Sequence, residues 1–125
     1  MEEFVKGLTW VGTRTEHYEE MVAFYRDTLR LSLEHEEGQF AGFRLPDGSK
    51  AEVFGPSDTE HTHFNKGPVP GFLVDDVKST RRVLEAKGIE FIGPAHEWES
   101  TGEAWSHFRA PDGNVYDIVQ GPKHQ

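Results

Sequence analysis

An internal repeat is the feature of this sequence that most constrains its fold. The stretch FRLPDGSKAEVFGP begins at Phe43, and a similar stretch, FRAPDGNVYDIVQGP, begins at Phe108, 65 positions later. Each stretch contains Pro-Asp-Gly, in which Pro fixes φ, Asp bonds to nearby backbone, and Gly adopts angles that other residues avoid. The flanking residues alternate and are rich in Phe, Val, Tyr and Ile, so each copy predicts a β-hairpin.

The repeat extends upstream of each hairpin into a predicted helix. Residues 16–30 place apolar side chains at helical spacing, and Thr15 is the expected N-cap. The second helix is expected to begin with Asp75 or Asp76 as its N-cap. It is expected to end at Gly88, because glycine best tolerates a left-handed residue at the end of a helix.

Short apolar stretches flank both helices and predict further strands. Residues 8–14 and 71–74 precede the helices, and residues 31–36 and 89–92 follow them. Each half of the chain therefore has the order strand, helix, strand, strand, strand. Such a βαβββ unit covers one face of its sheet with its own helix and leaves the other face open, so two copies can cover each other.

The order of elements divides the chain into two modules and a connecting segment. We expect the first βαβββ module over residues 1–56, a linker over residues 57–67 and the second module over residues 68–125, all forming one domain. The linker is polar, rich in turn-forming residues and without periodicity. Its His61 and His63 form an HxH pair that we expect to face solvent.

Composition and charge argue against several classes of function. The formal net charge is −9 and the longest basic run is Arg81-Arg82, so we expect no nucleic-acid partner. The absence of Cys excludes disulfides, thiolate metal ligands and a Cys nucleophile. No apolar run approaches the roughly 18 residues of a membrane span, and the N-terminal residues do not resemble a signal segment. We therefore expect a cytoplasmic protein without a membrane partner.

These features together resemble the vicinal oxygen chelate superfamily, the group of glyoxalases, bleomycin resistance proteins and extradiol dioxygenases. The resemblance is carried by AFYRDTLRL in the first module, FLVDDVKSTRRVLEAKGIEF in the second, and the hairpins ending in AEVF and YDIV. It implies an α+β fold in which two βαβββ modules pair their sheets into a half-open barrel around a cavity. Arg30 departs from the family pattern, which usually has Gly there, so we expect a strained or rearranged helix end.

The same resemblance implies one divalent metal, held by the first and last strands of each module. The last-strand positions carry Glu52 and Asp117, which are equivalent in the repeat. The first-strand positions fall on Trp10 and Val69, each seven residues before the start of a helix. Trp offers an N–H donor without a lone pair for a metal, and Val offers neither, so two of the four ligands are lost.

Strand alternation assigns further residues to the face that the resemblance turns toward the cavity. Aromatic rings near two carboxylates suit a flat, largely apolar ligand with a cationic or hydrogen-bond-donating group. Trp98 lies in the segment HEWESTGEAW, which we interpret as a mobile lip over the opening. The predicted ligand-binding residues are Trp10, Arg14, Phe40, Glu52, Trp105, His107 and Asp117.

The sequence leaves three functions open, and with them the question of whether the protein is an enzyme. The leading hypothesis is metal-free binding of a small hydrophobic or aromatic molecule, as in drug or metabolite sequestration, without a cofactor. The alternative is a divalent-metal-dependent lyase, isomerase or dioxygenase that uses Glu52, Asp117 and a recruited His107. The third is a non-catalytic domain whose cavity is filled by its own side chains. The resemblance also implies a homodimer.

Overall fold

A computed structural model of the chain describes residues 4–122, which form two compact modules. The first module comprises residues 9–69, and the second comprises residues 70–122 together with residues 4–8. Each module has the predicted βαβββ order, so the α+β class is confirmed. None of the helices within residues 4–122 is long and apolar enough to cross a membrane.

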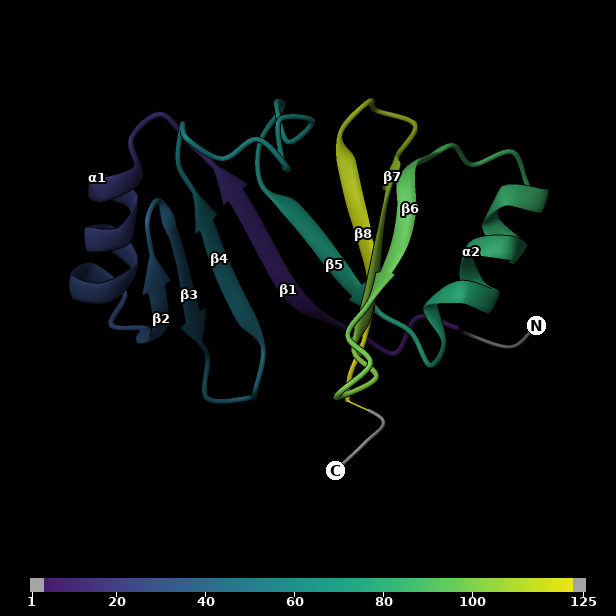
Figure 1. Cartoon of the computed structure of the whole chain (residues 1–125), viewed down its shortest axis with the longest axis horizontal. Coiled ribbons are helices and arrows are strands. Elements are labelled where there is room, and N and C mark those ends of the chain that lie inside the picture. The colour runs from purple at the N-terminus through teal and green to yellow at the C-terminus, as the bar shows by residue number, and fades with distance from the viewer. Residues whose placement is uncertain (1–3, 123–125) are drawn as a thin grey trace. The chain divides into compact units, whose positions relative to one another are not determined.

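The first module is a four-stranded mixed sheet with one helical segment on one face (Figure 1). Its strands lie in the order β2-β3-β4-β1, with β1 parallel to β4 and the other neighbours antiparallel. The elements are β1 (Gly7–Arg14), α1 (Tyr18–Ala23), the π-helix η1 (Phe24–Thr28), β2 (Ser32–Glu37), β3 (Phe40–Arg44) and β4 (Lys50–Phe54).

The core of the first module lies between the helical segment and the sheet. Alternate residues of β3 and β4, such as Phe43 and Val53, meet Tyr18, Val22 and Tyr25 from the helical segment. The rings of Tyr25 and Phe43 pack edge to face with centroids 5.5 Å apart. Because this packing uses every second strand residue, the intervening side chains occupy the opposite face of the sheet.

The second module repeats this arrangement with its own helix (Figure 1). Its strands lie in the order β5-β8-β7-β6, with β5 parallel to β8 and the other neighbours antiparallel. Between helix and sheet, Val74, Val77, Ala104 and Ile118 form the buried core. The elements are β5 (Val69–Leu73), α2 (Val77–Ala86), β6 (Phe91–Glu97), β7 (Ala104–Arg109) and β8 (Val115–Gln120).

The two Pro-Asp-Gly turns form as the sequence predicts. Gly48 has φ 89° and Gly113 has φ 86°, the left-handed region that favours glycine. Asp47 and Asp112 each accept a hydrogen bond from the backbone N–H two residues later, both at 2.9 Å. Both hairpins are therefore confirmed, and each turn is stabilised by its own aspartate.

The two helices agree with their predicted boundaries to different degrees. For α2, Asp76 is the N-cap and accepts a hydrogen bond from Ser79 N at 2.9 Å, and Gly88 has φ 91°. For α1, the predicted N-cap was wrong, because the helix begins at Tyr18 and His17 is the N-cap residue. Thr15 instead accepts a hydrogen bond from the backbone N–H of His17, which closes a turn before the helix.

The end of the first helix is rearranged at Arg30, as expected. Arg30 has φ 60°, a left-handed conformation at a residue other than glycine. The preceding turn widens into η1, in which Leu29 N donates to Phe24 O at 2.9 Å. Leu31 N then donates to Tyr25 O at 2.9 Å and closes the helix end. The wider turn and the left-handed residue together allow the chain to leave the helix without a glycine.

Candidate functional site

In each module, one sheet face is not covered by the helix, and the predicted site residues lie on these faces. In the first module, this face carries Trp10, Phe40 and Glu52, which we call the first aromatic face. Glu52 lies at its centre, because it pairs with Gly12 on β1 and with Gly42 on β3. A side chain on either glycine would project onto the same face, so the two glycines leave room beside the carboxylate.

The indole of Trp10 occupies the room above Gly12. A Cβ atom placed on Gly12 would lie only 2.1 Å from the Cη2 atom of that indole. In this position, Trp10 Nε1 donates a hydrogen bond of 3.0 Å to Glu52 Oε1. The position that the family resemblance assigns to a metal ligand therefore holds a donor to the neighbouring carboxylate.

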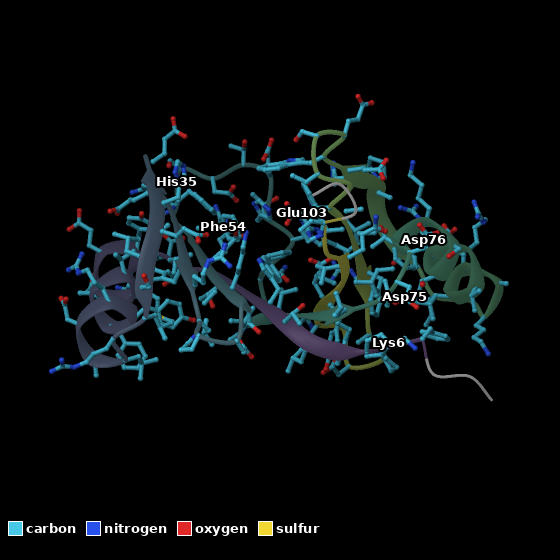
Figure 2. All side chains as sticks on the ribbon, turned by 90° about the horizontal axis from the view of Figure 1, so that it is seen from below. Lys6, His35, Phe54, Asp75, Asp76 and Glu103 are labelled. Atoms are coloured by element: carbon cyan, nitrogen blue, oxygen red, sulfur yellow. The ribbon has the colours of Figure 1, made fainter. Side chains whose placement is uncertain are left out.

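Phe40 lies on the other side of Glu52. Its ring tip would be 3.5 Å from a Cβ atom on Gly42, and its centroid is 5.5 Å from that of Phe54. His35 of β2 continues the row, with its ring centroid 5.9 Å from that of Phe40. Figure 2 labels His35 and Phe54 on this module. The carboxylate thus lies between an indole and a row of aromatic rings.

The segment after β4 folds back onto its own module. His61 stacks on Phe54, with ring centroids 3.9 Å apart and an interplanar angle of 19°. Phe64 is 3% exposed and packs edge to face against both His61 and Trp10, at 5.1 Å and 6.2 Å. The prediction that the HxH pair faces solvent is therefore wrong for His61, because its imidazole packs against the rings of Phe54 and Phe64.

Arg14 is bound to this folded-back segment. Its Nη2 donates to the backbone oxygen of Asp58 at 3.0 Å, and its Nε lies 3.5 Å from Asp58 Oδ2. His61 Nδ1 lies 2.9 Å from Asp58 Oδ1, and its backbone N–H donates to Oδ2 at 2.8 Å. Burial disfavours the charged carboxylate, but the hydrogen bonds from His61 outweigh it and lower the pKa of Asp58.

The second module carries Trp105, His107 and Asp117 on its helix-free face, which we call the second aromatic face. Asp117 is 2% exposed and pairs across the strands with His107. Its Oδ2 lies 3.8 Å from His107 Nε2, and its Oδ1 accepts a hydrogen bond of 3.1 Å from Ser106 N. The carboxylate of this module is therefore held by backbone and faced by an imidazole.

Trp105 is flanked by two rings from the same hairpin. His96 of β6 stacks on it, with centroids 5.5 Å apart and an angle of 22°, and Trp98 meets it edge-on at 6.2 Å. The indole of Trp98 is 60% exposed. Its segment is a hydrogen-bonded turn, in which Gly102 N donates to Trp98 O at 2.7 Å and Trp98 N donates to Glu103 O at 2.8 Å.

The structure thus groups the predicted residues by module. Sequence reasoning missed Asp58, His61 and Phe64, which lie in a segment that we interpreted as a linker, and His96, which stacks on Trp105. One signal was present, because Phe64 is a large apolar residue within an otherwise polar stretch and such residues are usually buried.

The donor set does not fit a divalent metal in the manner that the family resemblance implies. Within residues 4–122, no three His, Asp or Glu side chains gather so as to hold a metal ion. Zn and non-haem Fe sites normally include imidazole nitrogen among several protein ligands that surround one ion. Trp10 instead directs its N–H at Glu52, and Val69 has no donor atom. We therefore derive no chemistry that passes through a metal.

The chain belongs to the Glyoxalase/Bleomycin resistance protein/Dioxygenase superfamily, whose family model matches residues 7–118. This confirms the family that the repeated hairpins and helices indicate. Among curated proteins, no sequence matches this chain.

Solved structures with the same fold include methylmalonyl-CoA epimerases. The enzyme from Mycobacterium tuberculosis is 20% identical, with a TM-score of 0.74 and coverage of 97% of this chain and 91% of its own. The Streptomyces coelicolor epimerase in complex with 2-nitronate-propionyl-CoA is 17% identical, with a TM-score of 0.68 and coverage of 94% and 98%. A superfamily member from Vibrio splendidus 12B01 is 18% identical, with a TM-score of 0.64 and coverage of 92% and 99%.

Proposed function

We propose that this protein binds a small, planar, largely apolar molecule on its aromatic faces and holds it without a metal ion. The observation that carries the proposal is the hydrogen bond of 3.0 Å from Trp10 Nε1 to Glu52 Oε1. An indole offers a large flat surface for stacking and no lone pair for coordination. A ligand beside Trp10 and Glu52 is therefore recognised by contact and by charge.

The second aromatic face supports the same chemistry. Trp105 is held between His96 and Trp98, so its orientation is fixed before a ligand arrives. Rings whose positions are already fixed lose little entropy on binding. One structural neighbour is solved with an acyl-CoA analogue, so small-molecule binding is compatible with this fold.

The two carboxylates on the aromatic faces indicate what charge the preferred ligand carries. Glu52 places a carboxylate beside the indole of Trp10, and Asp117 lies on the same sheet face as Trp105. A cationic aromatic ligand gains from the carboxylate and from the face of the ring. We therefore expect a planar cation to bind more tightly than a planar anion of the same size.

Tryptophan fluorescence tests this preference directly. We expect proflavine, a planar tricyclic cation, to quench the emission saturably and more tightly than anthracene-9-carboxylate, a tricyclic anion. EDTA should leave both titrations unchanged. If neither molecule alters the emission at concentrations up to millimolar, the proposal fails, and a face filled by the protein's own side chains becomes the better account.

A variant of the carboxylate separates specific binding from general attraction to an acidic protein. Glu52→Gln should weaken proflavine binding about fivefold, since a favourable contact with a partly exposed charge is worth up to about 1 kcal/mol. Glu16→Gln removes the same charge from an exposed position outside the aromatic faces and should have no effect. Equal losses in the two variants would contradict recognition by Glu52.

A metal-dependent lyase, isomerase or dioxygenase remains the second candidate function. The observation in its favour is that His107 Nε2 lies 3.8 Å from Asp117 Oδ2, so the second module brings an imidazole and a carboxylate together. Elemental analysis of protein purified without chelator decides between metal-free binding and a metal-dependent enzyme. Stoichiometric metal would contradict the metal-free proposal.

We further propose a cytoplasmic homodimer on the strength of the family resemblance. Light scattering on the purified protein should give about twice the chain mass of 14.2 kDa. A mass that stays at that of one chain over the accessible concentration range would contradict the dimer.

A further inference from the structure

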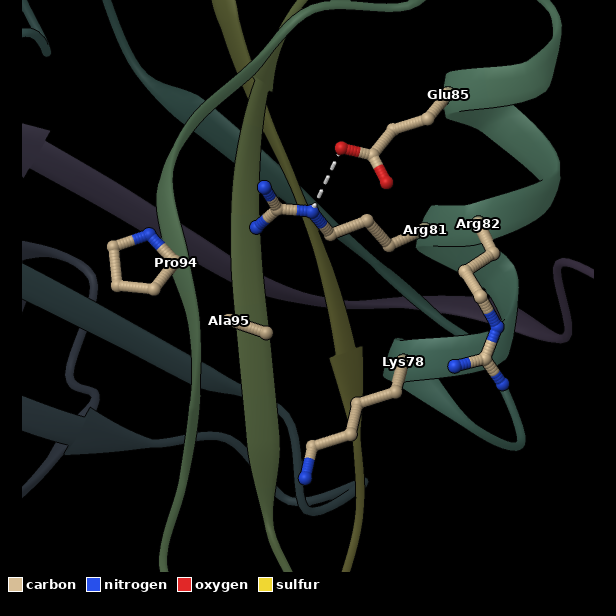
Figure 3. A pocket seen from close by; sticks show the side chains of 6 residues that line it. All are labelled: Lys78, Arg81, Arg82, Glu85, Pro94 and Ala95. Atoms are coloured by element: carbon tan, nitrogen blue, oxygen red, sulfur yellow. Dashed lines mark hydrogen bonds and ion pairs between the residues drawn. The ribbon is translucent and has the colours of Figure 1, made fainter.

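A groove between α2 and the edge strand β6 carries a concentration of positive charge. It is lined by Lys78, Arg81, Arg82, Glu85, Pro94 and Ala95, with a volume of about 370 Å³ (Figure 3). The four helix residues have the spacing i, i+3, i+4 and i+7, which places them on one stripe of the helix. Val77 and Thr80, which are buried, lie on a different side of α2. The basic stripe is therefore separate from the packed face of the helix.

A β-bulge shapes the opposite wall of the groove. The pairing of β6 with β7 shifts register between Ile92 and His96, and Gly93 within the bulge has φ 71°. Pro94 is tolerated there because β6 is an edge strand and needs no further backbone donor. Bulges bend a strand and redirect its backbone groups, and they often occur beside binding sites. Here the bulge presents Gly93 O toward α2.

Arg81 is held in place by this bulge. Its Nη1 donates to Gly93 O at 2.9 Å and to Ser106 Oγ at 3.2 Å, and its guanidinium lies 4.8 Å over the Phe91 ring. Its Nε lies 3.3 Å from Glu85 Oε2 (Figure 3). A guanidinium fixed in this way loses little freedom when it meets a further acceptor. The groove therefore contains one pre-positioned cation.

The other two cations of the groove are more accessible. Lys78 Nζ lies 3.4 Å from Glu97 Oε1 in an exposed pair, which contributes little energy and is easily exchanged. Arg82 is exposed, and its side chain makes no hydrogen bond or ion pair with another residue in the range 4–122. The groove region thus contains three positively charged side chains and two negatively charged ones, Glu85 and Glu97, in a chain of net charge −9. Such a local reversal of charge attracts anions.

We propose that this groove binds the phosphate group of a small phosphorylated molecule through Lys78, Arg81 and Arg82. Two guanidinium groups and one ammonium group suit the several oxygens of a phosphate or diphosphate. The groove lies on the helix side of the second module, whereas Trp105, His107 and Asp117 lie on the helix-free face of the same sheet. The inference is therefore independent of the proposed aromatic ligand.

Calorimetric titration of the protein with inorganic pyrophosphate at constant ionic strength tests the proposal. We expect saturable binding that sodium chloride at matched ionic strength does not reproduce. Arg82→Gln should weaken it about fivefold, the effect of one exposed charge contact. Arg82 is exposed on α2, so this variant should remain folded. Lys78→Gln should have a similar effect.

The control variant is Lys66→Gln, which removes one exposed positive charge from the segment after β4, outside the groove. It should bind pyrophosphate as the wild type does. Absence of saturable binding, or an equal loss in Lys66→Gln and Arg82→Gln, would overturn the proposal. A parallel measurement uses phosphatidylcholine vesicles with and without phosphatidic acid. Binding to the phosphatidic acid vesicles without binding to free pyrophosphate would assign the groove to a membrane surface and overturn the small-molecule proposal.

Discussion

The two modules place a carboxylate at the same position of the repeat but stabilise it in different ways. Glu52 is flanked by two glycines and accepts a hydrogen bond from the indole of Trp10. Asp117 occupies the equivalent place, is almost completely buried and accepts its hydrogen bond from the backbone of Ser106. The first carboxylate is therefore positioned by a side chain, and the second by the sheet itself.

The residue opposite each carboxylate explains this difference. Gly42 lies across from Glu52, and the equivalent residue across from Asp117 is His107. With no side chain on Gly42, the longer Glu52 can extend toward Trp10. With an imidazole in that place, a shorter carboxylate fits and remains close to its own strand. The change from Glu to Asp between the copies thus accompanies the change from Gly to His.

Removal of the buried carboxylate of Asp117 should have the largest effect on the stability of the protein. Asp117→Ala should lower the free energy of unfolding by about 3 kcal/mol, because it leaves a buried N–H of Ser106 without its acceptor. Glu52→Ala should cost only about 1 kcal/mol, since Glu52 is partly exposed. Urea denaturation of both variants measures the difference, and equal losses would show that the two carboxylates are held alike.

The two glycines beside Glu52 should respond differently to a methyl group. Gly12→Ala forces the indole of Trp10 off its position and breaks its hydrogen bond, at a cost of about 1–2 kcal/mol. Gly42→Ala is the matched control, because its new methyl group would meet Phe40 at an ordinary contact distance of 3.5 Å. Denaturation and the near-ultraviolet circular dichroism of tryptophan report the outcome. A Gly42→Ala variant as unstable as Gly12→Ala would contradict this account.

The carboxylate of Asp58, which accepts hydrogen bonds from His61, should stabilise the first module in a way that acid removes. The pKa of Asp58 is lowered below its ordinary 3.8, so its ionised form contributes stability that is fully present above that value. The contribution is lost as pH falls through the lower pKa of the folded protein. Asp58→Asn should therefore cost about 1 kcal/mol near neutral pH.

Urea denaturation of the wild type and Asp58→Asn across the acidic range measures this contribution. The difference between the two proteins should shrink as the medium becomes more acidic than pH 3.8. A difference that stays constant throughout would show that Asp58 acts by packing and not by charge.

Substitution at the end of the first helix should have the smallest effect on stability. Arg30 and Gly88 occupy corresponding places, with φ of 60° and 91°. Arg30→Gly should raise the free energy of unfolding by about 0.5–1 kcal/mol, because it relieves a left-handed conformation at a non-glycine residue. Arg30→Ala keeps the unfavourable conformation and should not stabilise the protein. Thermal denaturation compares the two, and stabilisation by both would assign the effect to the lost side chain.

The elements that were predicted correctly are those with local chemical causes. The Pro-Asp-Gly turns, the Asp76 cap and the left-handed end at Gly88 each follow from the conformational preferences of a few adjacent residues. The rearranged helix end at Arg30 follows instead from the family resemblance, because Arg30 stands where the family pattern usually has Gly. Local stereochemistry and a duplicated pattern were therefore enough to predict the module.

The parts that were missed depend on contacts between distant residues. Nothing local to Asp58 and His61 indicates that Phe54 and Arg14 will receive them, since the contacts join the segment after β4 to strands formed earlier. The N-cap prediction for α1 is wrong for a different, local reason, because the Thr15 hydroxyl accepts from the N–H of His17, two residues on, in a turn before the helix. Alternation predicted which face each strand residue occupies, but the side chains that cover a face come from elsewhere in the chain.

The attachment of residues 4–8 to the second module has a consequence for synthesis of the chain. The backbone N–H of Lys6 donates to Leu73 O at 2.8 Å, so this residue, which precedes β1, acquires its partner only after β5 has left the ribosome. Such a contact between distant residues delays folding. During synthesis, β1 can therefore pair with β4 before residues 4–8 take their place in the second module.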